Sequence, residues 1–281
     1  MVARYVLVDG FLGFVANWVT ENTGESVTMI VEAMKYSAKR LCLYLSGILG
    51  GNVLFGCVLK PAPSQYSDYH TNTPLIFPLT GESLIGTGER SVQQNPDHIF
   101  VADQRFAIDI VALAPGSLPP ERHNLVKRAL SGKLNLYEGD DFENNARHFC
   151  FGRQVVAPGD GIVVDVRDGV YDNIPGKRNT RDIPGNYVVI DHLNGEFSLL
   201  AHLKQSSVSV KQDAQVKAGD PIGQCGNSGN SNLPHLHYHL QNTPRWLDGE
   251  GLPAQFMNYY ANGKFVERGE PAQGEIIFAP P

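Results

Sequence analysis

Three histidines near the C-terminal end of the chain alternate with other residues, and this alternation constrains the fold most strongly. They are His235, His237 and His239, which follow Pro234 in the run Pro-His-Leu-His-Tyr-His. In a β-strand, side chains at i, i+2 and i+4 leave the same face, so a strand here would place three imidazoles together. Imidazole is the commonest protein ligand for zinc and the commonest general base near neutral pH. The pattern therefore predicts a strand that carries a metal or catalytic site.

The composition is typical of a globular β protein. The chain has 281 residues, which is enough for one large or two ordinary domains. It is 42% hydrophobic and contains 29 glycines and 18 prolines, as expected of a turn-rich protein with a substantial core. The formal net charge of −6 gives no basic footprint, so we expect no nucleic-acid partner.

No segment of the sequence is apolar enough for a transmembrane helix, so we expect none. The apolar stretch from Tyr5 to Val19 is interrupted by Asp9 and carries no small-residue cleavage site. It is therefore not identified as a signal peptide, and the residues alone leave the cellular compartment open.

A proline-rich segment divides the chain. Pro61-Ala62-Pro63-Ser64 and the polar residues that follow, as far as Pro74, are typical of a linker. We therefore expect an N-terminal domain over residues 1–65 and a larger domain over residues 75–281. The N-terminal domain has conflicting periodicities, with a helical stripe between residues 27 and 45 and strand-like runs at 41–45 and 53–58. A small β-sandwich of unknown role is the favoured interpretation.

The larger domain is predicted to be all-β. Short apolar runs at Phe106–Leu113, Val155–Val164, Tyr187–Ile190 and Phe197–Leu200 are separated by turn residues, and Asn194-Gly195 is a strong hairpin signal. Strands at this spacing favour an antiparallel sandwich or barrel-like core. The polar residues near 114–148 break the pattern and are predicted to form an insertion.

The four cysteines, Cys42, Cys57, Cys150 and Cys225, lack the paired spacing of a zinc knuckle. We expect them to be buried free thiols. A disulfide between Cys42 and Cys57 is the alternative.

Several motifs occur in a characteristic order. They are Gln154–Gly161, Gly185–His192, Ala201-His202-Leu203, Gly226–Gly229 and His235-Leu236-His237. In order and spacing they resemble the lysostaphin-type (LytM-like) zinc metallopeptidases over residues 75–242. The resemblance implies a duplicated hybrid motif fold, a small and mostly antiparallel β core. It also implies a groove that holds one Zn²⁺ and hydrolyses peptide bonds, most characteristically those of bacterial cell-wall peptidoglycan cross-links, and hence an extracytoplasmic location.

The resemblance also implies roles for individual residues. His237 and Asp109 correspond to zinc ligands, whereas His202 and His235 correspond to the catalytic histidines. These roles agree with zinc chemistry, because a catalytic zinc takes three nitrogen or oxygen ligands from the protein and leaves one position for water. A neighbouring histidine can then take a proton from that water.

One position departs from the family pattern. Arg105 stands where the family has its first ligand histidine, and a guanidinium stays protonated and cannot bind zinc. Two histidines are candidates for the missing ligand. We favour His98, because a branch of the family carries histidines just before a segment like Gln104–Asp109. His239 shares a strand face with His237 and is the alternative, either as a ligand or as a group that orients one. A site that no longer binds zinc is the third outcome.

Two functional classes follow from this comparison. The first is a zinc-dependent endopeptidase, which the retention of His202, His235, His237 and Asp109 favours. The second is a degenerate, non-catalytic relative that binds cell wall or a partner protein, which the change at Arg105 favours. The endopeptidase is our preferred hypothesis.

Overall fold

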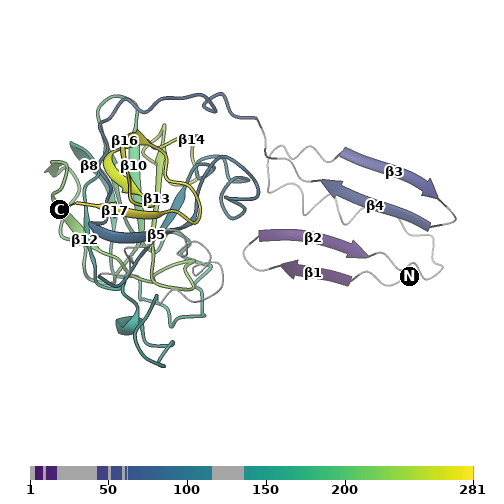
Figure 1. Ribbon diagram of the computed structural model, residues 1–281, viewed down its shortest axis with the longest axis horizontal. Helices are drawn as coiled ribbons and strands as arrows, with labels where there is room; N and C mark the ends of the chain where they lie inside the picture. Colours follow the sequence, from purple (N-terminus) through teal and green to yellow (C-terminus); the bar gives the residue numbers. More distant parts are fainter. Residues whose placement is uncertain are drawn as a thin grey trace. The chain divides into compact units, whose positions relative to one another are not determined.

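The computed structural model describes residue 61, residues 63–115 and residues 136–280, together with the backbone of four strands nearer the N-terminus (Figure 1). The chain divides into two units, Met1–Pro63 and Ser64–Pro281. Within the described ranges, no helix has the length and apolar character needed to cross a membrane. The predicted insertion near 114–148 falls partly on residues outside those described.

The first unit contributes two antiparallel strand pairs. β1 (Arg4–Val8) pairs with β2 (Phe11–Asn17), and β3 (Leu43–Leu49) pairs with β4 (Asn52–Val58). Strands β3 and β4 overlap the strand-like runs predicted at residues 41–45 and 53–58. The helical stripe falls mostly outside the described residues. Cys42 also lies outside them, so the alternative disulfide between Cys42 and Cys57 stays untested.

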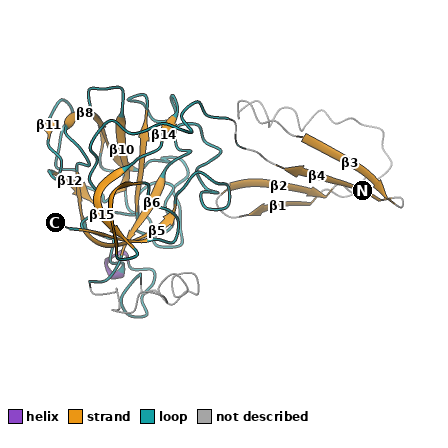
Figure 2. Ribbon diagram, turned by 45° about the horizontal axis from the view of Figure 1, so that its top comes forward, coloured by secondary structure: helices purple, strands orange, loops and turns teal. Residues whose placement is uncertain are grey.

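An antiparallel sheet dominates the second unit, as predicted, and Figure 2 shows that strands and loops make up almost all of it. The strand order is β11-β8-β9-β10-β13-β6-β5-β17-β15-β16, with β14 paired to β13. A separate pair joins β7 to β12. The bounds are β5 (Gly81–Thr87), β6 (Ile108–Ala112), β7 (Gln154–Val156), β8 (Gly161–Arg167), β9 (Asn186–Asp191), β10 (Phe197–Leu203), β11 (Gln215–Val216), β12 (Pro221–Gln224), β13 (Leu236–Gln241), β14 (Gly251–Leu252), β15 (Phe256–Ala261), β16 (Lys264–Gly269) and β17 (Ile276–Ala279). The short 3₁₀-helix η2 spans Asn145–Arg147.

Strand β13 is buried along its whole length, between β10 and β6. Its alternate residues Leu236, Tyr238 and Leu240 belong to the main hydrophobic core. Because successive side chains of a strand point to opposite faces, His237 and His239 lie on the other face. One face of β13 thus anchors the strand in the core while the other holds buried polar groups in a defined register.

Glu196 ties the segment after the linker to the turn between β9 and β10. Its carboxylate accepts hydrogen bonds from the Tyr69 hydroxyl at 2.8 Å, from the Asn72 amide at 2.6 Å and from the Thr73 amide at 2.8 Å. Burial alone would raise the pKa of Glu196, but the hydrogen bonds from Thr73 and Asn72 hold it below its ordinary value. The carboxylate is therefore a charged clamp on an otherwise irregular segment.

The cysteine prediction was wrong for two of the four residues. Cys150 and Cys225 form a disulfide, with their Cα atoms 5.8 Å apart and a sequence separation of 75 residues. Spacing along the chain could not indicate this pair, because the fold alone brings the segment before β7 next to the end of β12. The bridge fixes the residue that precedes the loop Gly226–Gly229.

Candidate active site

Asp109 lies at the centre of a cluster of histidines. It sits on β6 directly opposite His237 of β13, and its Oδ1 is 3.1 Å from His237 Nδ1. The same oxygen is 3.5 Å from His235 Nε2, while Oδ2 is 3.5 Å from His98 Nε2. Ligand atoms of His98, Asp109 and His237 all lie within 4.8 Å of one another. The structure thus brings together the three residues that the sequence suggested as metal ligands.

His98 reaches this cluster from the segment between β5 and β6, where Asn95 positions it. Asn95 is fully buried, and its Nδ2 lies 3.1 Å from the carbonyl oxygens of Glu89, Arg105 and Ala107. Its Oδ1 is 2.8 Å from His98 Nδ1. The other ring nitrogen, Nε2, is therefore the one directed at Asp109.

His202 and His235 form a pair beside the cluster. Their ring centroids are 4.9 Å apart, and the His202 ring is 5.6 Å from that of His237. His202 lies where the pairing of β10 with β9 shifts register, and its φ of 60° is in the left-handed region, where a non-glycine residue is strained. This strain at a candidate catalytic residue is a feature that functional sites commonly carry.

Backbone carbonyls orient both rings of the pair. His202 Nδ1 is 2.9 Å from the oxygen of Ser228, and His235 Nδ1 is 2.8 Å from the oxygen of Leu233. A carbonyl oxygen can only accept, so Nδ1 is the protonated nitrogen of each neutral ring. Each ring then presents the lone pair of Nε2 away from the backbone.

The charges in the cluster depend on one another. Burial would raise the pKa of Asp109, but the neighbouring His98 and His235 hold it well below its usual range. Burial lowers the pKa of His98 to about 4 and that of His202 well below its ordinary value. For His235, burial acts in the same direction, but the carboxylate of Asp109 outweighs it and raises the pKa. The site thus combines an ionised carboxylate with neutral rings at His98 and His202, while the carboxylate favours the charged form of His235.

The alternative ligand, His239, does not face Asp109. Its Nδ1 is 3.1 Å from His237 Nε2, at the opposite end of the His237 ring from the carboxylate. Its own Nε2 is 2.7 Å from Gln241 Oε1. Arg105 is buried just before β6.

Sequence reasoning missed three polar residues that support the site. Thr87 donates to Asp109 Oδ2 at 2.8 Å, Asn95 holds His98, and Gln241 holds His239. Only Gln241 carried a signal in the sequence, because it continues the alternation of His235, His237 and His239 by one more step.

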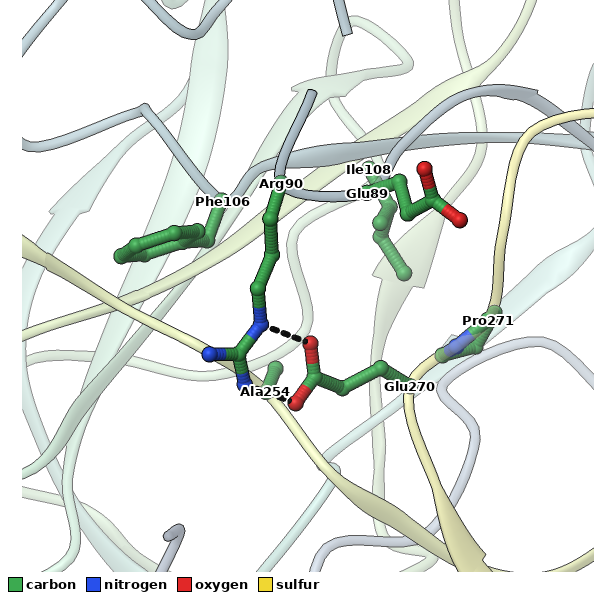
Figure 3. Close-up of a pocket in the computed structure, with 7 residues that line it drawn as sticks. All are labelled: Glu89, Arg90, Phe106, Ile108, Ala254, Glu270 and Pro271. Carbon is green, nitrogen blue, oxygen red and sulfur yellow. Dashed lines mark hydrogen bonds and ion pairs between the residues drawn. The ribbon is translucent and has the colours of Figure 1, made fainter. Parts of the chain in front are cut away.

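A small pocket on the other side of β6 is distinct from this cluster. Figure 3 shows its lining, in which Arg90 donates to Glu270 at 2.8 Å and lies over the Phe106 ring. Ile108 contributes to the lining, and the adjacent Asp109 points to the opposite face of the strand. The ion pair neutralises both charged groups, so the histidine cluster remains the candidate site.

Comparison with known proteins finds a family resemblance in part of the chain. Residues 139–249 match the model of peptidase family M23. This part of the chain is similar to the M23 peptidases. The match includes His202, His235 and His237, whereas His98 and Asp109 lie before it.

Similar proteins include peptidoglycan enzymes. The chain is 33% identical to the peptidoglycan DD-endopeptidase ShyA of Vibrio cholerae over 148 residues, covering 52% of this chain and 29% of that protein. It is 44% identical to the DD-carboxypeptidase/endopeptidase Mpg of Neisseria meningitidis over 54 residues, covering 19% of this chain and 12% of that protein. A solved zinc-containing peptidase from Vibrio cholerae has 30% identity and a TM-score of 0.27, covering 37% of this chain and 28% of that one. The chain therefore spans less than a third of the length of these relatives.

Proposed function

We propose that the larger domain is a zinc-dependent endopeptidase of the M23 type that hydrolyses peptide bonds of bacterial cell-wall peptidoglycan. The observation that carries the proposal is the convergence of His98, Asp109 and His237 within 4.8 Å, beside the pair His202 and His235. The family match and the peptidoglycan enzymes among the relatives support the substrate class. The Cys150–Cys225 disulfide supports an extracytoplasmic location, because disulfides persist mainly in oxidising compartments.

The donor atoms suit one zinc ion. Two imidazole nitrogens and a carboxylate oxygen form a ligand set of the catalytic type, which leaves a fourth position for water or substrate. Zinc ligands must be deprotonated, and the low pKa values of Asp109 and His98 keep both groups in that state at neutral pH. His98 would bind through Nε2, His237 through Nδ1 and Asp109 through its carboxylate.

Bound zinc would polarise the scissile carbonyl and lower the pKa of the attacking water. The chain's own contribution is to move protons and to bind charge. In His202 and His235, backbone carbonyls hold each ring through Nδ1, so Nε2 carries the free lone pair. Either Nε2 can therefore accept a proton from the water. The protonated nitrogen can then donate to the oxyanion or pass its proton to the leaving amine. Asp109 stabilises a protonated His235, whose Nε2 is 3.5 Å away.

Two measurements on the purified protein test the proposal. Elemental analysis should find about one zinc per chain, and the protein should release peptides from peptidoglycan sacculi until a chelator removes the metal. A protein without zinc, and with no peptide release when zinc is supplied, would contradict it. Zinc binding and sedimentation with sacculi, without cleavage of any wall type, would instead identify the non-catalytic relative.

A further inference from the structure

Two buried amides lie behind the proposed zinc ligands. Asn95 contacts His98 directly. Gln241 contacts His239, which in turn contacts His237. We propose that these amides select opposite tautomers for the two ligand histidines, so that His98 offers Nε2 and His237 offers Nδ1 to the same point beside Asp109. This inference rests on the proposed zinc site, and it makes His239 and both amides positioning residues.

The orientation of Gln241 follows from its partners. Its Nε2 donates to the carbonyl oxygens of Thr243 at 2.6 Å and Arg245 at 3.0 Å. Because a carbonyl oxygen can only accept, the amide nitrogen must face these two atoms and Oε1 must face His239. Oε1 accepts in turn, so the His239 nitrogen 2.7 Å away, Nε2, carries the hydrogen.

The tautomer of His239 in turn determines the tautomer of His237, the proposed zinc ligand on β13. With its hydrogen on Nε2, neutral His239 presents the lone pair of Nδ1 to His237 Nε2 at 3.1 Å. His237 then donates from Nε2 and turns the lone pair of Nδ1 toward Asp109 Oδ1 at 3.1 Å. A lone pair opposite a carboxylate oxygen is unfavourable unless a cation lies between them, and a metal bound at this position would be that cation. The rival tautomer of His237 would instead set two lone pairs against each other between the rings.

Asn95 selects the tautomer of His98 in the same way, but the selected tautomer is the opposite one. Three backbone carbonyls at 3.1 Å occupy its Nδ2, so its Oδ1 faces His98 Nδ1 and accepts from it. The hydrogen of His98 therefore lies on Nδ1 and the lone pair on Nε2, which points at Asp109 Oδ2. Both amides are fully buried, so water does not compete for these hydrogen bonds.

A pair of substitutions at His239 separates positioning from ligation. His239→Gln keeps an acceptor for His237 and a donor for Gln241, whereas His239→Leu keeps neither. We expect zinc affinity, measured by competition with a chelator, to fall by roughly 10–100-fold in His239→Leu, as for other outer-shell partners of metal ligands. His239→Gln should stay close to the unmutated protein. An equal loss in both variants would identify His239 as a ligand, and unchanged affinity in both would also overturn the inference.

Nitrogen-15 NMR of the histidine rings gives a readout that needs neither catalysis nor a variant that folds. In the unmutated protein we expect hydrogen on His239 Nε2 and on His98 Nδ1, and with zinc bound also on His237 Nε2. Gln241→Leu should convert His239 into a mixture of tautomers. Hydrogen on His239 Nδ1 in the unmutated protein would refute the inference. Because the His239 signal needs no metal, this result stands even if the protein binds no zinc and the proposed function fails.

Discussion

Replacing His98 with alanine tests the least conventional ligand of the proposed zinc site. Structural zinc sites with four ligands reach apparent binding free energies of about 10–16 kcal/mol, or about 2.5–4 kcal/mol per ligand. At 1.4 kcal/mol per factor of ten, the loss of one ligand weakens binding by on the order of 100–1,000-fold. His98 is 7% exposed and its Nε2 is 3.5 Å from Asp109 Oδ2, so water is a poor substitute at this position. We expect a loss within that range for His98→Ala.

The assay is competition with a chromophoric chelator at fixed pH, with zinc content determined in parallel. His70→Ala is the matched control, because His70 is exposed and its ring lies 3.4 Å from Gln255, which is not one of the residues of the cluster. A zinc affinity for His98→Ala equal to that of the control would refute the assignment. A normal thermal transition in both variants would show that the difference arises at the site.

Three further predictions concern catalysis and stability. His202→Ala and His235→Ala should each lower the rate of peptidoglycan cleavage by about 100-fold or more while zinc content stays unchanged, and full activity in either would exclude its catalytic role. Burial would raise the pKa of Glu196, but the hydrogen bonds that its carboxylate accepts hold that pKa below the ordinary 4.5. The ionised carboxylate therefore stabilises the fold above pH 4.5, and this stabilisation is lost as the pH falls through the lower pKa of the folded state. Urea unfolding should show this acid-dependent loss in the unmutated protein and a smaller one in Glu196→Gln, which should itself cost about 2–3 kcal/mol near neutral pH. Replacing Cys150 and Cys225 with serine should reduce the free energy of unfolding by about 2–5 kcal/mol, and an unchanged midpoint would show that the bridge does not form in solution.

The strand pattern of the larger domain could be predicted from the sequence because it depends on local alternation. The Asn194-Gly195 turn does join the antiparallel pair β9 and β10, and Gly195 has a φ of 86°. Alternation also placed His237 and His239 on one face of a strand. It could not indicate which strand lies opposite, so the pairing of His237 with Asp109 was available only through family resemblance.

Features that depend on contacts between distant segments were out of reach of such patterns. Asn95 has no periodic neighbour, and its role appears only when the chain folds back to bring the Arg105 and Ala107 carbonyls to it. The Cys150–Cys225 bridge is of the same kind. The roles of His98, His202 and His235 remain predictions, because they concern chemistry that geometry alone does not test.

The geometry of one ring favours His98 over the strand neighbour His239 as the replacement for the ligand absent at Arg105. An imidazole has two nitrogens on different sides of its ring, and His237 directs Nδ1 at Asp109 and Nε2 at His239. A metal bound by His237 Nδ1 and Asp109 is therefore turned away from His239, even though the two histidines share a strand face. A replacement ligand has to come from the side of Asp109 that is open to another segment. His98 reaches that side, 3.5 Å from Oδ2, on a segment that Asn95 fastens to the backbone next to Arg105. The change from histidine at position 105 is thus compatible with a complete ligand set.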